Sequence, residues 1–264
     1  YRQDRQMDIT EPFARSMVLA SDPLSAEKRF QAETLSADLC VGETSVPLND
    51  ISFSSQVKAG LFDLDHKKVL FAQNMYDQVY PASITKIMTA LLAMEYNQPD
   101  TQVTITEEDL ALEDGSQMSG LAVGDTVTMD QLFHALLIYS ANDAAMAIAR
   151  QVGGSVENFV QMMNDKAAEL GCVNTHFNNP HGLSEGEDAT LHYTCCYDMA
   201  LIAKAAYQNE TFRAITATKT YQIPPTNKHD EITYLQNHNE MIHAFKTRGQ
   251  YLYEYCVGGK TGYT

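Results

Sequence analysis

The chain has 264 residues, 44% of them hydrophobic, which is enough for one large globular domain or two of ordinary size. Its 18 basic and 34 acidic residues give a net charge of −16. Because such a surface repels phosphates and anionic headgroups, the composition argues against nucleic-acid and membrane-surface binding. No apolar run reaches the roughly 18 residues of a spanning helix, and no hydrophobic signal segment follows the polar start.

Residues 1–50 mix charged residues, serine and proline without sustained periodicity, apart from a short helix expected around 24–35. We expect an N-terminal extension or tether there, followed by one domain over residues 51–264. That domain starts with two apolar strands, 57–65 and 69–74, around the polar turn at His66. This pattern predicts an antiparallel hairpin.

The middle of the chain is mainly helical by its apolar spacing. Helices are predicted at 84–94, 129–138, 144–152 (capped by Asn142 and Asp143), 156–170 and 194–207. Strands are predicted again at 219–223 and 251–257. This order indicates an α/β fold, an antiparallel sheet flanked by helices with an all-helical subdomain inserted at about 95–215.

Cysteine and histidine do not form a recognisable metal or thiol motif. The five cysteines, an odd number without zinc-site spacing, are interpreted as small buried hydrophobic residues: Cys40, Cys172, Cys195, Cys196 and Cys256. His176, His181 and His192 are close in sequence, but their spacing matches no zinc pattern. We therefore expect neither a metal nor an organic cofactor.

The pattern Ser-x-x-Lys occurs three times, at Ser25/Lys28, Ser55/Lys58 and Ser83/Lys86. Alone it is weak, because serine commonly caps helices and lysine commonly follows. The third copy opens an apolar helix, where residues three apart share a face and the amine can reach the hydroxyl. Burial beside a second cation would lower the pKa of Lys86, so that it could deprotonate Ser83.

Two further polar elements follow in order. Ser140-Ala-Asn142 lies between two predicted helices, where a loop can present a hydroxyl and an amide to a cleft. Lys260-Thr-Gly262 ends an apolar stretch, where a strand edge can bind an extended peptide and a glycine allows close approach. Each element alone is more often structural. Together, and with each of these two occurring once, they favour a catalytic site.

At this point the sequence resembles the penicillin-recognising serine D-alanyl-D-alanine carboxypeptidases, the low-molecular-mass penicillin-binding proteins. The resemblance covers about residues 55–264 and implies a β-lactamase/transpeptidase-like fold. The stretches that carry it, besides the three motifs, are Tyr80-Pro-Ala-Ser-Ile-Thr-Lys-Ile-Met-Thr, Glu113-Asp-Gly-Ser with Val123-Gly-Asp, Leu136-Leu-Ile-Tyr-Ser-Ala-Asn-Asp-Ala-Ala, Asn179-Pro-His-Gly-Leu, Tyr197-Asp-Met-Ala and Gly259-Lys-Thr-Gly-Tyr-Thr.

The resemblance implies four catalytic residues. Ser83 would attack the peptide bond between two terminal D-alanines and form an acyl-enzyme, with Lys86 as general base. Ser140 would relay the proton to the leaving amine, and Lys260 would hold Ser140 electrostatically. Water would then release the shortened peptidoglycan stem peptide, whereas a β-lactam antibiotic would remain trapped on Ser83.

Four further residues would bind the substrate. Asn142 would hydrogen-bond the peptide backbone, and Thr261 would bind the terminal carboxylate. Gly262 would let the ligand approach, and the backbone N–H groups of Tyr263 and Ser83 would form the oxyanion hole. The substrate implies work outside the bacterial cytoplasmic membrane, secreted or tethered through a segment not present here.

Two departures from the family pattern are visible. Ala141 stands where the middle motif often has glycine, and a methyl group there could narrow the cleft. The chain also stops two residues after Gly262, where the family continues with further strands and a helix. We therefore expect a domain truncated after the Lys-Thr-Gly motif.

Two other functions share these motifs. A serine β-lactamase would need a deacylating glutamate between the second and third motifs. Glu185, Glu187 and Asp188 lie in that interval, but they lack the Glu-x-x-Leu-Asn pattern. A non-catalytic sensor of muropeptides or β-lactams could keep all three motifs, and persistent acylation without peptide turnover would identify it.

Overall fold

The computed structural model describes residues 45–47, 53–183, 190–244 and 246–263. The predicted helix at 24–35, the Ser25/Lys28 pair and the acidic residues at 185, 187 and 188 lie outside these ranges. The described chain forms two compact units. The first holds the residues up to Val79, Asp165–His176 and Tyr193–Lys204; the second holds Tyr80–Asn164, Phe177–His192 and the residues from Ala205 onward.

The first unit contains the predicted hairpin. Strands β2 (Ala59–Asp63) and β3 (Lys68–Gln73) pair antiparallel, and β1 (Ser45–Val46) adds to the other side of β3. The turn between β2 and β3 is closed by Asp63, whose carboxylate accepts from the backbone and the ring of His66. The hairpin prediction is confirmed, and β1 comes from within the stretch expected to be an extension.

Helix α8 (Cys196–Tyr207) begins in this unit, where its first turns share a core with the sheet. Ala72, Met75 and Tyr197 are buried together in that core. Cys195 is buried among them, and burial raises the pKa of its thiol to about 12. Such a thiol is protonated and unreactive at neutral pH, which agrees with its interpretation as a small hydrophobic residue.

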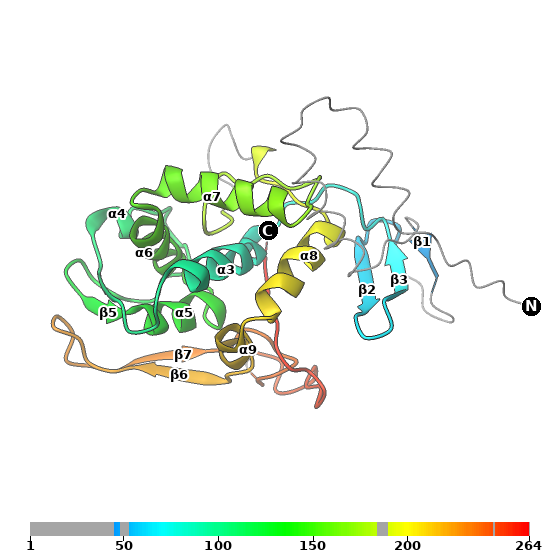
Figure 1. The fold of residues 1–264 in the computed structure, drawn as a ribbon. Coiled ribbons are helices and arrows are strands. Elements are labelled where there is room, and N and C mark those ends of the chain that lie inside the picture. Colours follow the sequence, from blue (N-terminus) through cyan, green and yellow to red (C-terminus); the bar gives the residue numbers. More distant parts are fainter. Residues whose placement is uncertain (1–44, 48–52, 184–189, 245, 264) are drawn as a thin grey trace, which may run out of the picture. The chain divides into compact units, whose positions relative to one another are not determined.

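The second unit is built on three helices, α3 (Lys86–Tyr96), α5 (Met129–Leu137) and α6 (Asn142–Gly153), which pack against one another. Figure 1 shows these three helices side by side. Met88, Leu132 and Ile148, one from each helix, are fully buried. Two further helices of this unit are α4 (Glu107–Leu110) and α9 (Glu210–Thr216), and α7 (Val156–Glu169) begins in it and ends in the first unit. The region expected to be all helical also contains a small antiparallel sheet, β4 (Gln102–Thr104) with β5 (Thr126–Thr128).

The helix starts differ in how well the sequence predicts them. Thr128 and Gln131 form a reciprocal capping box at the start of α5, so the predicted start is confirmed. The predicted cap of α6 is wrong. The capping position is Ala141, in extended conformation, and Asn142 and Asp143 form the first turn. Asp143 Oδ1 accepts from the N–H of Ala144 at 3.0 Å, but no side-chain hydrogen bond is made from the capping position itself.

The last pair of strands is β6 (Thr220–Ile223) and β7 (Thr233–Gln236), an antiparallel hairpin that confirms the strand predicted at 219–223. The strand predicted at 251–257 is wrong, because that segment forms turns. Its tyrosines Tyr251, Tyr253 and Tyr255 are exposed, and no described strand lies beside it to complete a ladder. An apolar, aromatic segment becomes a strand only where such a neighbour exists.

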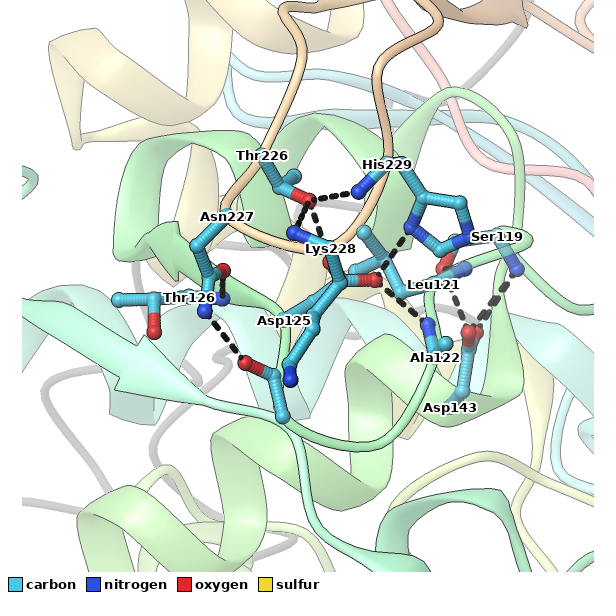
Figure 2. A network of polar contacts seen from close by, with 11 residues as sticks. Ser119, Leu121, Ala122, Asp125, Thr126, Asp143, Thr226, Asn227, Lys228 and His229 are labelled. Atoms are coloured by element: carbon cyan, nitrogen blue, oxygen red, sulfur yellow. Dashed lines mark hydrogen bonds and ion pairs between the residues drawn. The ribbon is translucent and has the colours of Figure 1, made fainter.

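Buried Asp125 joins two loops, the one before β5 and the one between β6 and β7, as Figure 2 shows. Its carboxylate accepts from the backbone N–H of Ala122 at 2.6 Å and from the Thr226 hydroxyl, and it pairs with His229 at 2.7 Å. Burial alone would raise the pKa of Asp125, but these hydrogen bonds and the histidine hold it below its ordinary value.

Replacing Asp125 by asparagine should therefore lower the free energy of unfolding by about 1–3 kcal/mol at neutral pH, since the amide cannot accept all three bonds. Because the folded-state pKa is depressed, this contribution is lost as pH falls through it, so the variant and the parent should converge in acid. Urea unfolding at neutral and acid pH measures the difference. Asp114→Asn, at an exposed aspartate, is the control and should match the parent.

Candidate active site

Ser83 lies in a single turn of 3-10 helix, η1 (Ala82–Thr85), which runs directly into α3. In a 3-10 turn, residues three apart are eclipsed, so the side chains of Ser83 and Lys86 point the same way. The Lys86 Nζ atom lies 3.0 Å from Ser83 Oγ. By contrast, Lys58, in the other described Ser-x-x-Lys pair, forms an ion pair with Asp77 at 3.1 Å.

Lys86 is fully buried and has two further oxygen partners. Its Nζ donates to Asn142 Oδ1 and to the backbone oxygen of His181, each at 2.7 Å. Both oxygens can only accept hydrogen bonds. A neutral Lys86 amine therefore uses its two N–H groups on them, and its lone pair is left pointing at the Ser83 hydroxyl.

The electrostatic setting favours that neutral amine. Burial lowers the pKa of Lys86 well below its ordinary value, and the nearby Lys260 lowers it further. Asp143 acts in the opposite direction but does not reverse the shift. A lysine in such a setting can accept a proton from a hydroxyl near neutral pH.

Ser140 stands in the short connection between α5 and α6, with a left-handed backbone (φ 66°). A non-glycine residue in that region costs about 1–3 kcal/mol, and such strain gathers at functional sites. The connection is held by the backbone N–H of His238, which donates to Ile138 O at 3.0 Å. The result is that Ser140 Oγ lies 2.9 Å from Lys260 Nζ.

Hydrogen bonds of Asn142 and of the residue that follows it fix the position of the Asn142 backbone. Its N–H donates to Gln117 O at 2.8 Å, and the next residue, Asp143, accepts from the backbone N–H of Ser119 at 2.9 Å and from its hydroxyl (Figure 2). With Asn142 Oδ1 on Lys86, its amide N–H groups are directed elsewhere. They are the donors that a substrate carbonyl would need.

The third motif lies beside the Ser83 turn. Lys260 is half-buried, and burial lowers its pKa to about 7. A Cβ atom on Gly262 would lie 3.1 Å from Pro81 O and 3.0 Å from the Ile84 side chain, so glycine permits this close approach. The segment has no regular secondary structure, so the predicted strand edge is wrong, and its Tyr263 is 96% exposed.

The structure thus brings together five of the eight proposed site residues, in two hydrogen-bonded groups. Lys86 bonds to Ser83 and Asn142, Lys260 bonds to Ser140, and the charge of Lys260 acts on Lys86. Gly262 touches the Ser83 turn, whereas Thr261 and Tyr263 are exposed on the same segment. The sequence reasoning missed the carbonyl of His181. A backbone acceptor carries no sequence signal, although the stretch 179–183 was already one of the family-like stretches.

Comparisons with known proteins identify the family of the chain. Residues 45–264 match the peptidase S11 family model, described as D-alanyl-D-alanine carboxypeptidase. The chain is 38% identical over 210 residues to D-alanyl-D-alanine carboxypeptidase DacF of Bacillus subtilis, covering 78% of this chain and 50% of DacF. To DacB2 of Mycobacterium tuberculosis it is 32% identical, covering 83% of this chain and 69% of DacB2. The chain therefore spans about half the length of DacF.

Solved structures are similar as well. The Streptomyces K15 DD-transpeptidase has a TM-score of 0.66 and 29% identity, covering 76% of this chain and 77% of its own. The D-alanyl-D-alanine carboxypeptidase from Mycobacterium tuberculosis has a TM-score of 0.67 and 31% identity, covering 76% and 70%. The likeness confirms the predicted fold class. With a family match that includes all three motifs and most of the described chain, the chain belongs to the S11 family of serine peptidases, the D-alanyl-D-alanine carboxypeptidases.

Proposed function

We propose that the protein is a serine-type carboxypeptidase that removes the terminal D-alanine from peptidoglycan stem peptides ending in D-Ala-D-Ala. We assign the peptidase domain to residues 51–264. The observation that carries the proposal is the contact of the buried Lys86 Nζ with Ser83 Oγ at 3.0 Å, with two acceptor oxygens as its other partners. No metal or organic cofactor takes part in the proposed steps.

In the acylation step, Lys86 takes the Ser83 proton as Ser83 Oγ bonds to the carbonyl carbon between the two D-alanines. The carbon–nitrogen bond then breaks, and the leaving amine takes a proton through Ser140, which Lys260 holds at 2.9 Å. D-alanine departs, leaving an ester on Ser83. Water, deprotonated in the same site, hydrolyses that ester and restores the serine.

The substrate would be held by the remaining site residues. The amide N–H groups of Asn142 would donate to the peptide backbone, and Thr261 would bind the terminal carboxylate beside the cationic Lys260. The backbone N–H groups of Ser83 and Tyr263 would stabilise the oxyanion. Gly262 would leave room for the peptide backbone.

A β-lactam would acylate the same serine, because its strained amide also presents a carbonyl to Ser83. Its leaving amine stays attached through the opened ring, so it blocks the path of water and the adduct persists. The proposed substrate lies outside the bacterial cytoplasmic membrane, and we propose that the protein works there. None of the described helices is long and apolar enough to span a bilayer.

Release of D-alanine from a peptide ending in D-Ala-D-Ala tests the proposal directly. We expect steady release by the parent, none by Ser83→Ala, and none from the matching L-Ala-L-Ala peptide. A stable benzylpenicillin adduct without D-alanine release would contradict the enzyme and identify a sensor. Rapid hydrolysis of benzylpenicillin without peptide turnover would instead identify a β-lactamase.

The rate of acylation by benzylpenicillin should depend on pH through both lysines. It should rise with pH as Lys86 loses its proton, and fall as Lys260, with a pKa of about 7, loses the charge that orients Ser140. Stopped reactions analysed by intact mass from about pH 5 to about pH 10 measure this profile. In Lys260→Arg the guanidinium stays charged, so the alkaline fall should disappear; an unchanged fall would assign it to another group.

A further inference from the structure

The direction of the Lys86 lone pair depends on a backbone oxygen outside the three motifs. His181 O, one of the two acceptors of Lys86, belongs to the loop at 178–183. A backbone carbonyl can aim the amine only if the loop that carries it is fixed relative to the Ser83 turn. The contacts that fix this loop are therefore part of the site.

Some of the hydrogen bonds that fix the loop at 178–183 lie within the loop itself. Asn179 Oδ1 accepts from the N–H of Gly182 at 2.6 Å, and its Nδ2 donates to Leu183 O at 2.8 Å. These bonds close the loop into a tight turn around His181. They set its shape but do not join it to the helix that carries Lys86.

The loop is joined to that helix by His192. Its Nε2 lies 2.8 Å from the hydroxyl of Thr85, the residue just before Lys86. Its Nδ1 lies 2.7 Å from Asn178 Oδ1, at the start of the loop. The backbone N–H of Asn178 also lies 3.1 Å from Nδ1, so either tautomer of the ring joins Thr85 to Asn178.

The His192 ring is held in this orientation by its surroundings. It is 2% exposed, and the ring of Phe177 packs against it edge-on with centroids 5.7 Å apart. A second tie runs from Thr89, one turn further along α3, whose hydroxyl donates to Pro180 O at 2.6 Å. Both ties attach to the loop just before His181, and on the helical side they start from Thr85 and Thr89, on either side of Lys86 in the chain.

We propose that His192 is a positioning residue for the general base: by joining Thr85 to Asn178, it holds His181 O on Lys86 and so points the Lys86 lone pair at Ser83. The inference rests on the proposed function, because it assigns the means by which that same base is aimed. His192 acts through Thr85 and the loop, and it has no role in binding substrate.

The test is the pH profile of benzylpenicillin acylation in His192→Ala. We expect the plateau rate to fall by about 10- to 100-fold, the size of effect that a misplacement of about 1 Å produces. We also expect the acid limb to move to lower pH, because a Lys86 ammonium without its carbonyl acceptor is less stable. The charged groups that act on Lys86 are Lys260 and Asp143, which the substitution leaves unchanged. The His181 ring also lies near Lys86, but burial, first of all, lowers its pKa to about 3, so it stays neutral over the range of the profile.

Two further variants separate positioning from a general loss of folding. His192→Gln keeps a side-chain polar atom near Thr85 and should restore the rate to within a few-fold of the parent. His229→Ala removes a histidine that pairs with Asp125, in the loop between β6 and β7, and it should leave the profile unchanged. Urea unfolding of each variant measures the folded fraction.

A double-mutant cycle with Thr85→Val gives the sharpest readout. If His192 acts through Thr85, the double variant should be no slower than the slower single variant, whereas independent effects would multiply. A His192→Ala variant with the parental rate and acid limb, or a lower rate with an unshifted acid limb, would overturn the inference. Failure of the parent itself to be acylated would contradict the proposed function instead, so the two failures are distinguishable.

Discussion

Replacing Lys86 by methionine should slow the acylation of Ser83 by benzylpenicillin by about 10²- to 10⁴-fold, the usual contribution of a general base. Methionine has a similar length and fills the buried space, but it cannot accept the serine proton. Asn142 Oδ1 and His181 O would lose their shared donor, which is why the variant must also be tested for folding. Intact mass against time gives the rate, and urea unfolding gives the folded fraction.

Lys58→Met is the matched control, because Lys58 stands in the same Ser-x-x-Lys pattern but pairs with Asp77. It should be acylated at the parental rate. A Lys86→Met protein that is folded and acylated within a few-fold of the parent would show that another group activates Ser83.

Gly182→Ala should damage both the fold and the site. Gly182 has a left-handed backbone (φ +88°), and a Cβ atom there would lie 1.8 Å from Ala82 O and 2.8 Å from Thr85 Oγ1. No side chain fits at those distances, so the loop at 178–183 must move away from the Ser83 turn. We expect the free energy of unfolding to fall by about 3 kcal/mol or more, from strain and overpacking together. Acylation should slow at least about 10-fold, because His181 O moves with the loop.

Gly115→Ala isolates the backbone part of this effect. Gly115 has nearly the same φ (+87°), but nothing lies within 4 Å of the Cβ position. Its unfolding free energy should therefore fall by only about 1–2 kcal/mol, with acylation unchanged. Equal losses of stability for the two variants would mean that the close contact with Ala82 does not matter.

The parts of the site that the sequence predicts are those governed by local geometry. Ser83 and Lys86 are three residues apart at the start of an apolar segment, and a helical turn of either kind brings them together. Helices α3, α5 and α7 are recognisable from their apolar spacing because each buries one face or more.

The parts that could not be predicted depend on partners distant in sequence. The strand expected at 251–257 has the right composition, yet it lacks a described neighbour to pair with. Strands β1, β4 and β5 have two or three residues each, too few for periodicity to show. The carbonyl of His181 is invisible for a different reason, since any residue would supply the same backbone oxygen.

The departure in the middle motif has a simple structural consequence. Ala141 has an ordinary extended backbone (φ −63°) and is fully buried, so no glycine is required there for conformation. The left-handed residue of the motif is Ser140. A methyl group at 141 therefore packs into the interior of the unit and does not strain the turn that presents Ser140 to Lys260.

The most direct test of the central claim, that Ser83 is the nucleophile, is intact mass after addition of benzylpenicillin, with peptide mapping of the adduct. We expect one stable adduct on Ser83 in the parent, and none in a folded Ser83→Ala variant. An adduct that maps to another residue, or that persists in Ser83→Ala, would contradict the account, and so would a folded parent that is never acylated.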